Sequence, residues 1–152
     1  MLPESLRDHP VASAFEDIAA AAKFEFAELT IEVAPENIVD ALGRAKALGF
    51  EQLTTVTGVD RYPLEPRFEV VYHLHSFSKK LRLRLKARVS GARPEIETAC
   101  GVYSSANWYE RETWDLFGVV FLNHPDLRRI MLPDDWEGHP LRRDVPTTGT
   151  RY

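Results

Sequence analysis

An unbroken alternation of apolar and basic side chains between residues 81 and 89 restricts the fold more than any other feature of this sequence. Alternate positions are apolar (Leu81, Leu83, Leu85, Ala87, Val89), and the positions between them are basic (Arg82, Arg84, Lys86, Arg88). Successive side chains of a β-strand point to opposite faces. The segment is therefore predicted to be a strand with one face on a core and one in water, as in an antiparallel sheet with an exposed side.

Other segments carry weaker patterns, some typical of strands and some typical of helices. Residues 67–77 and 80–89 are predicted to form a hairpin, with further strands at 24–33 and 50–59. One helix is predicted at 11–22, which is alanine-rich. A second is predicted to begin after Pro35 and to end at Gly49, its C-terminal cap. A third is predicted at 106–117, ended by Gly118. The order of elements indicates an α+β fold. We expect a mainly antiparallel sheet of about four strands, with helices packed on one face.

The end of the chain differs from the rest in its content of proline and glycine. From residue 123 onward these residues recur too often for long regular elements. A length of 152 residues suits one domain. We therefore predict a single α+β domain over residues 1–122, including the helix at 106–117, and an extended C-terminal interface tail over residues 123–152.

The segment 79–93 contains seven Lys or Arg and no acid. One interpretation is a docking face for an acidic partner or for phosphates. The other is a solvated strand face, made basic partly to discourage pairing at a sheet edge. A net charge of −4 argues against a general nucleic-acid binder, and the strand has no interleaved aromatic side chains on which bases could stack.

Metal and cofactor chemistry has little support in the residue pattern. His73 and His75 share a strand face, but a metal would need further ligands, for which Asp60, His124 and His139 are the candidates. The single cysteine, Cys100, rules out an internal disulfide and a thiolate cage for zinc or an iron–sulfur cluster. We expect no catalytic, cofactor-binding or metal site in this chain.

The acids of the helix at 106–117 could suggest acid–base catalysis, but Glu110, Glu112 and Asp115 have no nucleophile or glycine-rich phosphate loop beside them. The stretch from Trp108 to Asp144 is more informative. It holds two His-Pro steps, two Arg-Arg pairs and all three tryptophans of the chain. Trp, Tyr and Arg are the usual anchors of protein interfaces, so this stretch is predicted to bind another protein.

Three patterns follow one another in this stretch: Glu110-Arg111-Glu112 with Asp115 and Gly118, then His124-Pro125-Asp126-Leu127-Arg128-Arg129-Ile130, then Gly138-His139-Pro140-Leu141-Arg142-Arg143-Asp144. In this order and close spacing they resemble the signature of the 30 kDa subunit family (the C subunits) of the proton-pumping NADH–quinone oxidoreductase, respiratory complex I. The resemblance covers the whole chain loosely and residues 108–144 closely.

The resemblance implies a structural subunit of the hydrophilic arm that binds no cofactor, with FMN and the iron–sulfur clusters in partner subunits. Its implied partners are the large quinone-site subunit and the nearby iron–sulfur subunits, at the cytoplasmic face of the plasma (inner) membrane. The chain would support assembly of the quinone-reducing module and reach the membrane only through the complex. The implied interface residues are Glu110, Arg111, Glu112, Asp115, His124, Asp126, Arg128, Arg129, His139, Arg142, Arg143 and Asp144.

Two alternatives stay open. The chain could be the equivalent subunit of a related membrane-bound hydrogenase, or of a quinone oxidoreductase fed by ferredoxin or another donor, because such complexes share this module. It could also be a free-standing binding module that uses the basic strand at 79–93. The motifs do not name the electron donor or the quinone.

Overall fold

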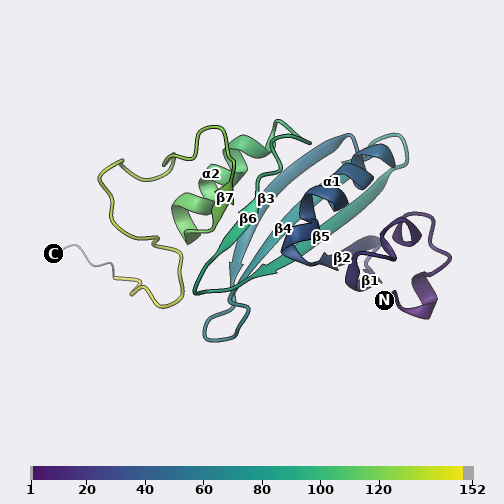
Figure 1. The fold of residues 1–152 in the computed structure, drawn as a ribbon, viewed down its shortest axis with the longest axis horizontal. Coiled ribbons are helices and arrows are strands. Elements are labelled where there is room, and N and C mark those ends of the chain that lie inside the picture. The colour runs from purple at the N-terminus through teal and green to yellow at the C-terminus, as the bar shows by residue number, and fades with distance from the viewer. Residues whose placement is uncertain (1, 149–152) are drawn as a thin grey trace.

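The computed structural model describes residues 2–148 and has an α+β fold (Figure 1). A five-stranded sheet has the strand order β1-β2-β5-β4-β3, and a two-stranded sheet joins β6 to β7. Only the pairs β2–β5 and β6–β7 are parallel. The strands are β1 (Ala19–Glu25), β2 (Glu28–Val33), β3 (Gln52–Asp60), β4 (Phe68–Ser76), β5 (Leu81–Val89), β6 (Glu95–Glu97) and β7 (Val120–Leu122). The helices are α1 (Ile38–Ala47) and α2 (Ala106–Phe117), with 3-10 turns η1 (Glu4–Leu6), η2 (Ala12–Phe15) and η3 (Pro35–Asn37).

The apolar face of the five-stranded sheet forms the core. Leu83 and Leu85 of β5 are buried there together with Ile38 and Leu42 of α1, which lies across this face (Figure 1). The second helix, α2, packs on the same face at the edge strand β3. A Cβ added to Gly58 of β3 would lie 3.1–3.2 Å from side chains of α2, so this glycine permits the close approach. The prediction that the helices pack on one face is confirmed.

Several boundaries predicted from the sequence are confirmed. The alternating segment is β5, and it pairs with β4 in the predicted hairpin. The helix after Pro35 ends next to Gly49, which has φ +90°. The helix α2 spans residues 106–117, and Gly118 follows it at φ +77°. A left-handed residue is the common way to end a helix, and glycine adopts it without steric cost.

Two predictions for the first 33 residues are wrong. No α-helix spans residues 11–22, where a short 3-10 turn is followed by strand β1. The predicted single strand at 24–33 is instead the end of β1, a turn at Phe26 and Ala27, and β2. The alanines favour a helix only weakly, and pairing with β2 supplies the backbone hydrogen bonds of β1, so tertiary context overrides the local preference.

The expected, mainly antiparallel sheet of about four strands is confirmed, with five strands, and residues 2–148 also contain the two-stranded sheet of β6 and β7, which was not expected. The hairpin β1–β2 accounts for the fifth strand, and β6 and β7 have only three residues each. A three-residue strand is too short to show a period of two, so its sequence carries almost no signal.

The basic face of β5 lies in the middle of the sheet, not at its edge. Protection of an edge strand is therefore the wrong explanation for its basic residues. Neighbouring strands supply acids to three of them: Arg84 pairs with Glu28, Lys86 with Glu69, and Arg88 with Glu32. The excess of basic residues along the sequence is thus partly neutralised by acids from β2 and β4.

The last part of the chain, residues 123–148 (called the tail below), contains no helix or strand as far as the structure describes it. It runs past α2 and back toward the sheet (Figure 1). Residues 149–152, which the sequence also assigned to an extended tail, lie outside the described residues. That residues 1–122 form a separate folding unit stays a prediction.

Candidate functional site

The three sequence motifs meet around one buried carboxylate, Asp115 of α2. Arg129 donates to Asp115 Oδ1 at 2.6 Å. Three consecutive backbone N–H groups, of Ile130, Met131 and Leu132, donate to Oδ2 at 3.1, 2.8 and 3.0 Å. Burial alone would raise the pKa of Asp115, but these donors hold it below its ordinary value. The carboxylate therefore fixes the path of the tail where it crosses the helix.

Arg129 extends this anchor to more distant parts of the tail. Its Nη2 donates to the backbone carbonyls of Trp136 at 2.8 Å and Gly138 at 3.0 Å. The guanidinium also lies 5.5 Å from the ring centre of Trp114. A planar guanidinium can donate to a carboxylate and to carbonyls at the same time. One side chain thus joins the helix to two separate points of the tail.

The C-terminal end of α2 is capped by the third motif. The last carbonyls of a helix have no partner within the helix. Here Arg142 Nε donates to the carbonyl of Phe117 at 2.7 Å, the backbone N–H of Leu141 donates to that of Leu116 at 3.1 Å, and His139 Nδ1 donates to that of Asp115 at 2.9 Å. The tail thereby replaces water at this helix end.

A second buried arginine, Arg111, holds the middle motif. Its Nε donates to the carbonyl of Arg128 at 3.2 Å and its Nη2 to that of Arg129 at 3.4 Å. The guanidinium stacks over the ring of Trp108 with its carbon 4.7 Å from the ring centre. Arg111 thus lies between an exposed tryptophan and the backbone of the tail, and it fixes both.

Glu110, the first residue of the motifs, is buried on the other side of α2. Its carboxyl accepts hydrogen bonds from the Thr98 hydroxyl at 2.5 Å and from the Ala99 N–H at 2.6 Å. Burial raises the pKa of Glu110. Its contacts hold the segment before the helix in place and do not reach the surface.

Cys100, Glu110 and His124 bring three ligand-type atoms within 4.8 Å of one another. The hydrogen bonds of His124 argue against a metal there. Its Nδ1 accepts from the N–H of Asp126 at 3.0 Å, and its Nε2 lies 3.1 Å from the carbonyl of Asn107, which can only accept. The proton is therefore on Nε2, 3.8 Å from Glu110. A histidine that binds metal through Nε2 needs the opposite tautomer.

The metal candidates considered from the sequence are also held apart by other contacts. His73 and His75 do share a strand face, as predicted. Asp60, however, is bound by Arg67, and His139 by the end of α2. Among the described residues, no group of three or more ligand-type side chains includes either strand histidine.

Asp60 and Arg67, at the facing ends of β3 and β4, form an anchor that the motifs did not predict. Arg67 donates to Asp60 at 2.8 and 2.9 Å and to Asp144 at 2.7 Å, while the N–H of Arg143 donates to Asp60 at 2.8 Å. Burial opposes ionisation, yet these donors lower the pKa of Asp60 to about 2. The only signal in the sequence was an acid and an arginine on either side of a turn with two prolines.

The predicted interface residues divide into two groups. Most have partners within the chain, and three of them are themselves buried: Glu110, Arg111 and Asp115. The exposed group comprises Glu112, Asp126, Arg128, Arg143 and Asp144. Trp108 and Met131 are also exposed, each to 62%. We call Trp108, Glu112, Arg128 and Met131 the outer patch. That these residues bind another subunit stays a prediction.

Residues 2–148 include no helix that is both long and apolar enough to pass through a bilayer. In the candidate site, every described motif side chain that is buried binds another part of the same chain, so these side chains hold the surface in one arrangement. Chemically, the site can hold a tail on a helix and present side chains from both.

Known proteins are similar to this chain in sequence and in fold. Residues 31–151 match the family model of the respiratory-chain NADH dehydrogenase, 30 Kd subunit. The NADH-quinone oxidoreductase C subunit of Geotalea uraniireducens is 51% identical over 123 residues, covering 80% of this chain and 75% of that protein. The corresponding protein of Geobacter sulfurreducens is 53% identical over 124 residues, covering 80% and 76%.

Two solved structures are similar. The trypsin-resistant fragment (1-134) of Nqo5 is 33% identical with a TM-score of 0.64, covering 70% of this chain and 88% of that one. A chain of the membrane-bound sulfane sulfur reductase, an archaeal respiratory membrane complex, is 28% identical with a TM-score of 0.76, covering 90% and 84%. From the family match and the identity to the two bacterial relatives, this chain belongs to the 30 Kd subunit family of the respiratory-chain NADH dehydrogenase.

Proposed function

We propose that the chain is a structural subunit of the peripheral arm of a proton-translocating NADH–quinone oxidoreductase, where it supports assembly of the quinone-reducing module. It binds no cofactor and does no chemistry alone in this proposal, and FMN and the iron–sulfur clusters belong to partner subunits. The names of its relatives support the type of complex. The use of its buried charged side chains in structural contacts supports the non-catalytic role.

The observation that carries the proposal is the tail held in place by its own helix. The contacts of Asp115, Arg129 and Arg142 order the tail before any partner is present. A surface that is already ordered loses less conformational entropy on binding, so more of the contact energy appears as affinity. The buried residues of the three motifs therefore make contacts within the chain. They contribute to an interface indirectly, because they hold the residues of the outer patch in place.

The outer patch has the composition of an interface. Trp108 is largely exposed although it is large and apolar, and Arg111 holds its ring from one side. Tryptophan and arginine are enriched among residues that dominate binding energy. In the proposal the patch faces the large quinone-site subunit and the nearby iron–sulfur subunits. The chain then lies at the cytoplasmic face of the plasma membrane and reaches the membrane only through the complex.

A pair of substitutions tests the role of the patch in the assembled complex. Trp108→Ala removes the exposed ring of the outer patch, and Phe26→Ala removes a fully exposed ring at the β1–β2 turn, at the other end of the molecule (Figure 1). We expect Trp108→Ala to reduce the amount of assembled complex and NADH–quinone activity in membranes, and Phe26→Ala to leave both unchanged. Equal, normal assembly of the two variants would contradict the proposal.

A second candidate is the equivalent subunit of a related respiratory complex with another electron donor. The similarity to a chain of the sulfane sulfur reductase over 90% of this sequence favours it. The same surface would then serve a different complex. Co-purification decides between the two: a flavin-containing, NADH-oxidising partner supports the first candidate, and a complex without one supports the second.

A further inference from the structure

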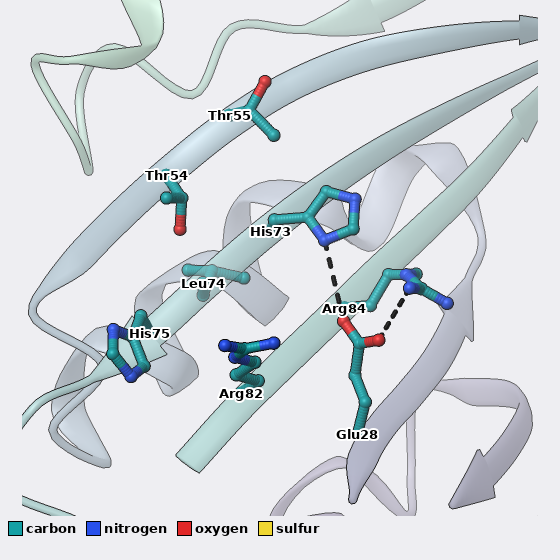
Figure 2. Close-up of a pocket in the computed structure, with 8 residues that line it drawn as sticks. All are labelled: Glu28, Thr54, Thr55, His73, Leu74, His75, Arg82 and Arg84. Atoms are coloured by element: carbon teal, nitrogen blue, oxygen red, sulfur yellow. Dashed lines mark hydrogen bonds and ion pairs between the residues drawn. The ribbon is translucent and has the colours of Figure 1, made fainter. Parts of the chain in front are cut away.

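The face of the five-stranded sheet opposite the helices carries a hollow of about 480 Å³ at the end of β4 and β5 (Figure 2). His73, His75, Arg82 and Arg84 line it, together with Glu28 of β2. It lies on a different face of the molecule from α2 and the tail. None of the contacts described for the tail involves it.

The hollow contains the same pair of side chains twice. In the antiparallel register of β4 and β5, His73 lies opposite Arg84, and His75 lies opposite Arg82. The first pair holds a carboxylate: Glu28 lies 2.6 Å from Arg84 Nη2 and 3.6 Å from His73 Nδ1 (Figure 2). This first pair shows what an imidazole and a guanidinium at these positions bind.

The second pair holds no carboxylate among the residues that the structure describes. Strand β2 supplies Glu28 to the first pair, but it begins at that residue, and the chain turns away at Phe26 and Ala27. Glu28 lies opposite Arg82 in the register of β2 and β5, but its carboxylate is turned to Arg84 and His73, so it is not paired with Arg82. Arg82 is exposed, and within residues 2–148 it makes no ion pair. The rings of Phe77 and His75 are in contact edge to face, with the ring centres 4.7 Å apart.

We propose that His75 and Arg82 bind a carboxylate side chain from an acidic segment of a neighbouring protein subunit. This inference rests on the proposed function, because it requires the chain to lie in a complex. It adds a second docking surface on the face away from the outer patch. The partner's Asp or Glu lies beside His75 and Arg82 as Glu28 lies beside His73 and Arg84.

The charge of the hollow favours a carboxylate over a phosphate. The two arginines and the one glutamate that line the hollow, Arg82, Arg84 and Glu28, together carry one net positive charge. One carboxylate balances that charge, whereas a phosphate brings up to two negative charges. The hollow is also lined by strand side chains rather than by a glycine-rich loop whose backbone N–H groups could hold phosphate oxygens. A lipid phosphodiester carries only one negative charge, but it too would find no loop of backbone N–H donors in the hollow.

The first test identifies the partner within the assembled complex. A photoreactive phenylalanine analogue replaces Thr54, an exposed residue that lines the hollow. After irradiation of the purified complex, mass spectrometry locates the attached peptide. A cross-link to an Asp- or Glu-rich segment of another subunit is the expected result. A cross-link to lipid, to a segment without acids, or to nothing overturns the inference.

The second test uses the isolated full chain, so its failure leaves the proposed function untouched. A triglutamate peptide with blocked ends is titrated while backbone amide signals are followed by NMR. We expect shifts around His75 and Arg82, with binding weakened roughly twofold to fivefold by Arg82→Gln, the range of an exposed ion pair. The control Arg88→Gln changes an exposed arginine of the same strand face that is already paired with Glu32.

The same titration with inorganic phosphate and with phosphatidylglycerol vesicles separates the possible ligands. The inference predicts that both bind more weakly than the peptide at equal charge concentration. Tighter binding of phosphate or of the vesicles overturns it, and so does an Arg88→Gln variant that loses as much peptide binding as Arg82→Gln. Melting temperatures of both variants check that the sheet is intact.

Discussion

Replacing Asp115 by asparagine tests the anchor of the tail most directly. The substitution keeps the size of the side chain, but it removes the charge and replaces one carboxylate oxygen by an amide NH2 group, which is a donor. That donor then faces either Arg129 or the three backbone N–H groups that now point at the carboxylate. We expect the tail to detach around residues 129–132 while the sheet and α1 stay folded.

The size of the effect follows from the burial of the pair. Asp115 is fully buried, and the side chain of Arg129 is only 11% exposed. Removing one partner of a buried ion pair costs about 3–5 kcal/mol when the other charge stays buried. Here release of the tail lets Arg129 reach water, which limits the loss. We therefore expect a decrease of about 2–4 kcal/mol in the free energy of unfolding.

Urea unfolding and hydrogen exchange measure the two parts of this prediction. The amides of Ile130, Met131 and Leu132 should lose their protection in Asp115→Asn, and the unfolding midpoint should fall. The matched control is Glu112→Gln, an exposed position three residues earlier on the same helix, where we expect a change within about 0.5 kcal/mol. A loss below about 1 kcal/mol with the three amides still protected would show that the Asp115 carboxylate does not anchor the tail.

Three further predictions follow from the same contacts. Arg129→Lys keeps a charge for Asp115 but loses the planar fork, so amide exchange should accelerate from residue 136 to 138 while residues 130–132 change less; equal acceleration would argue against a shared anchor. Gly118→Ala places a Cβ against His139 at φ +77°, and urea unfolding should show a loss of roughly 1–3 kcal/mol; an unchanged midpoint would contradict this. Asp60 has a folded pKa of about 2 against 3.8, so its stabilisation is complete above pH 3.8 and is lost as the pH falls toward 2. Unfolding at pH 5 and 2.5 should therefore show a smaller acid-induced loss in Asp60→Asn than in the wild type, and an equal loss would be inconsistent with the assigned pKa.

The sequence predicts the parts of this fold whose patterns are long. Strand β5 has nine residues of strict alternation, and α2 has a clear end at Gly118, so both are placed correctly. The first 33 residues are misassigned because four alanines in a row prefer a helix when considered alone, while the pairing of β1 with β2 decides their conformation. Pairing between strands is a tertiary effect that local propensity does not contain.

The site is predictable as a set of residues but not as a set of contacts. The motifs name Asp115 and Arg129, yet the sequence could not show that they bind each other rather than a neighbouring subunit. A charged residue that satisfies the backbone of its own chain and one that binds a partner look alike in a sequence. Asp60 and Arg67 escape prediction as an anchor because their partners lie 83 and 77 residues away along the chain.

The most direct test of the proposed function is a native gel of mildly solubilised membranes from the source cell, probed for this chain and stained for NADH oxidation. We expect the chain to migrate with a large NADH-oxidising band, and Trp108→Ala to reduce its share in that band. If the chain migrates alone as a small species in the wild type, the proposed place in an NADH–quinone oxidoreductase is contradicted.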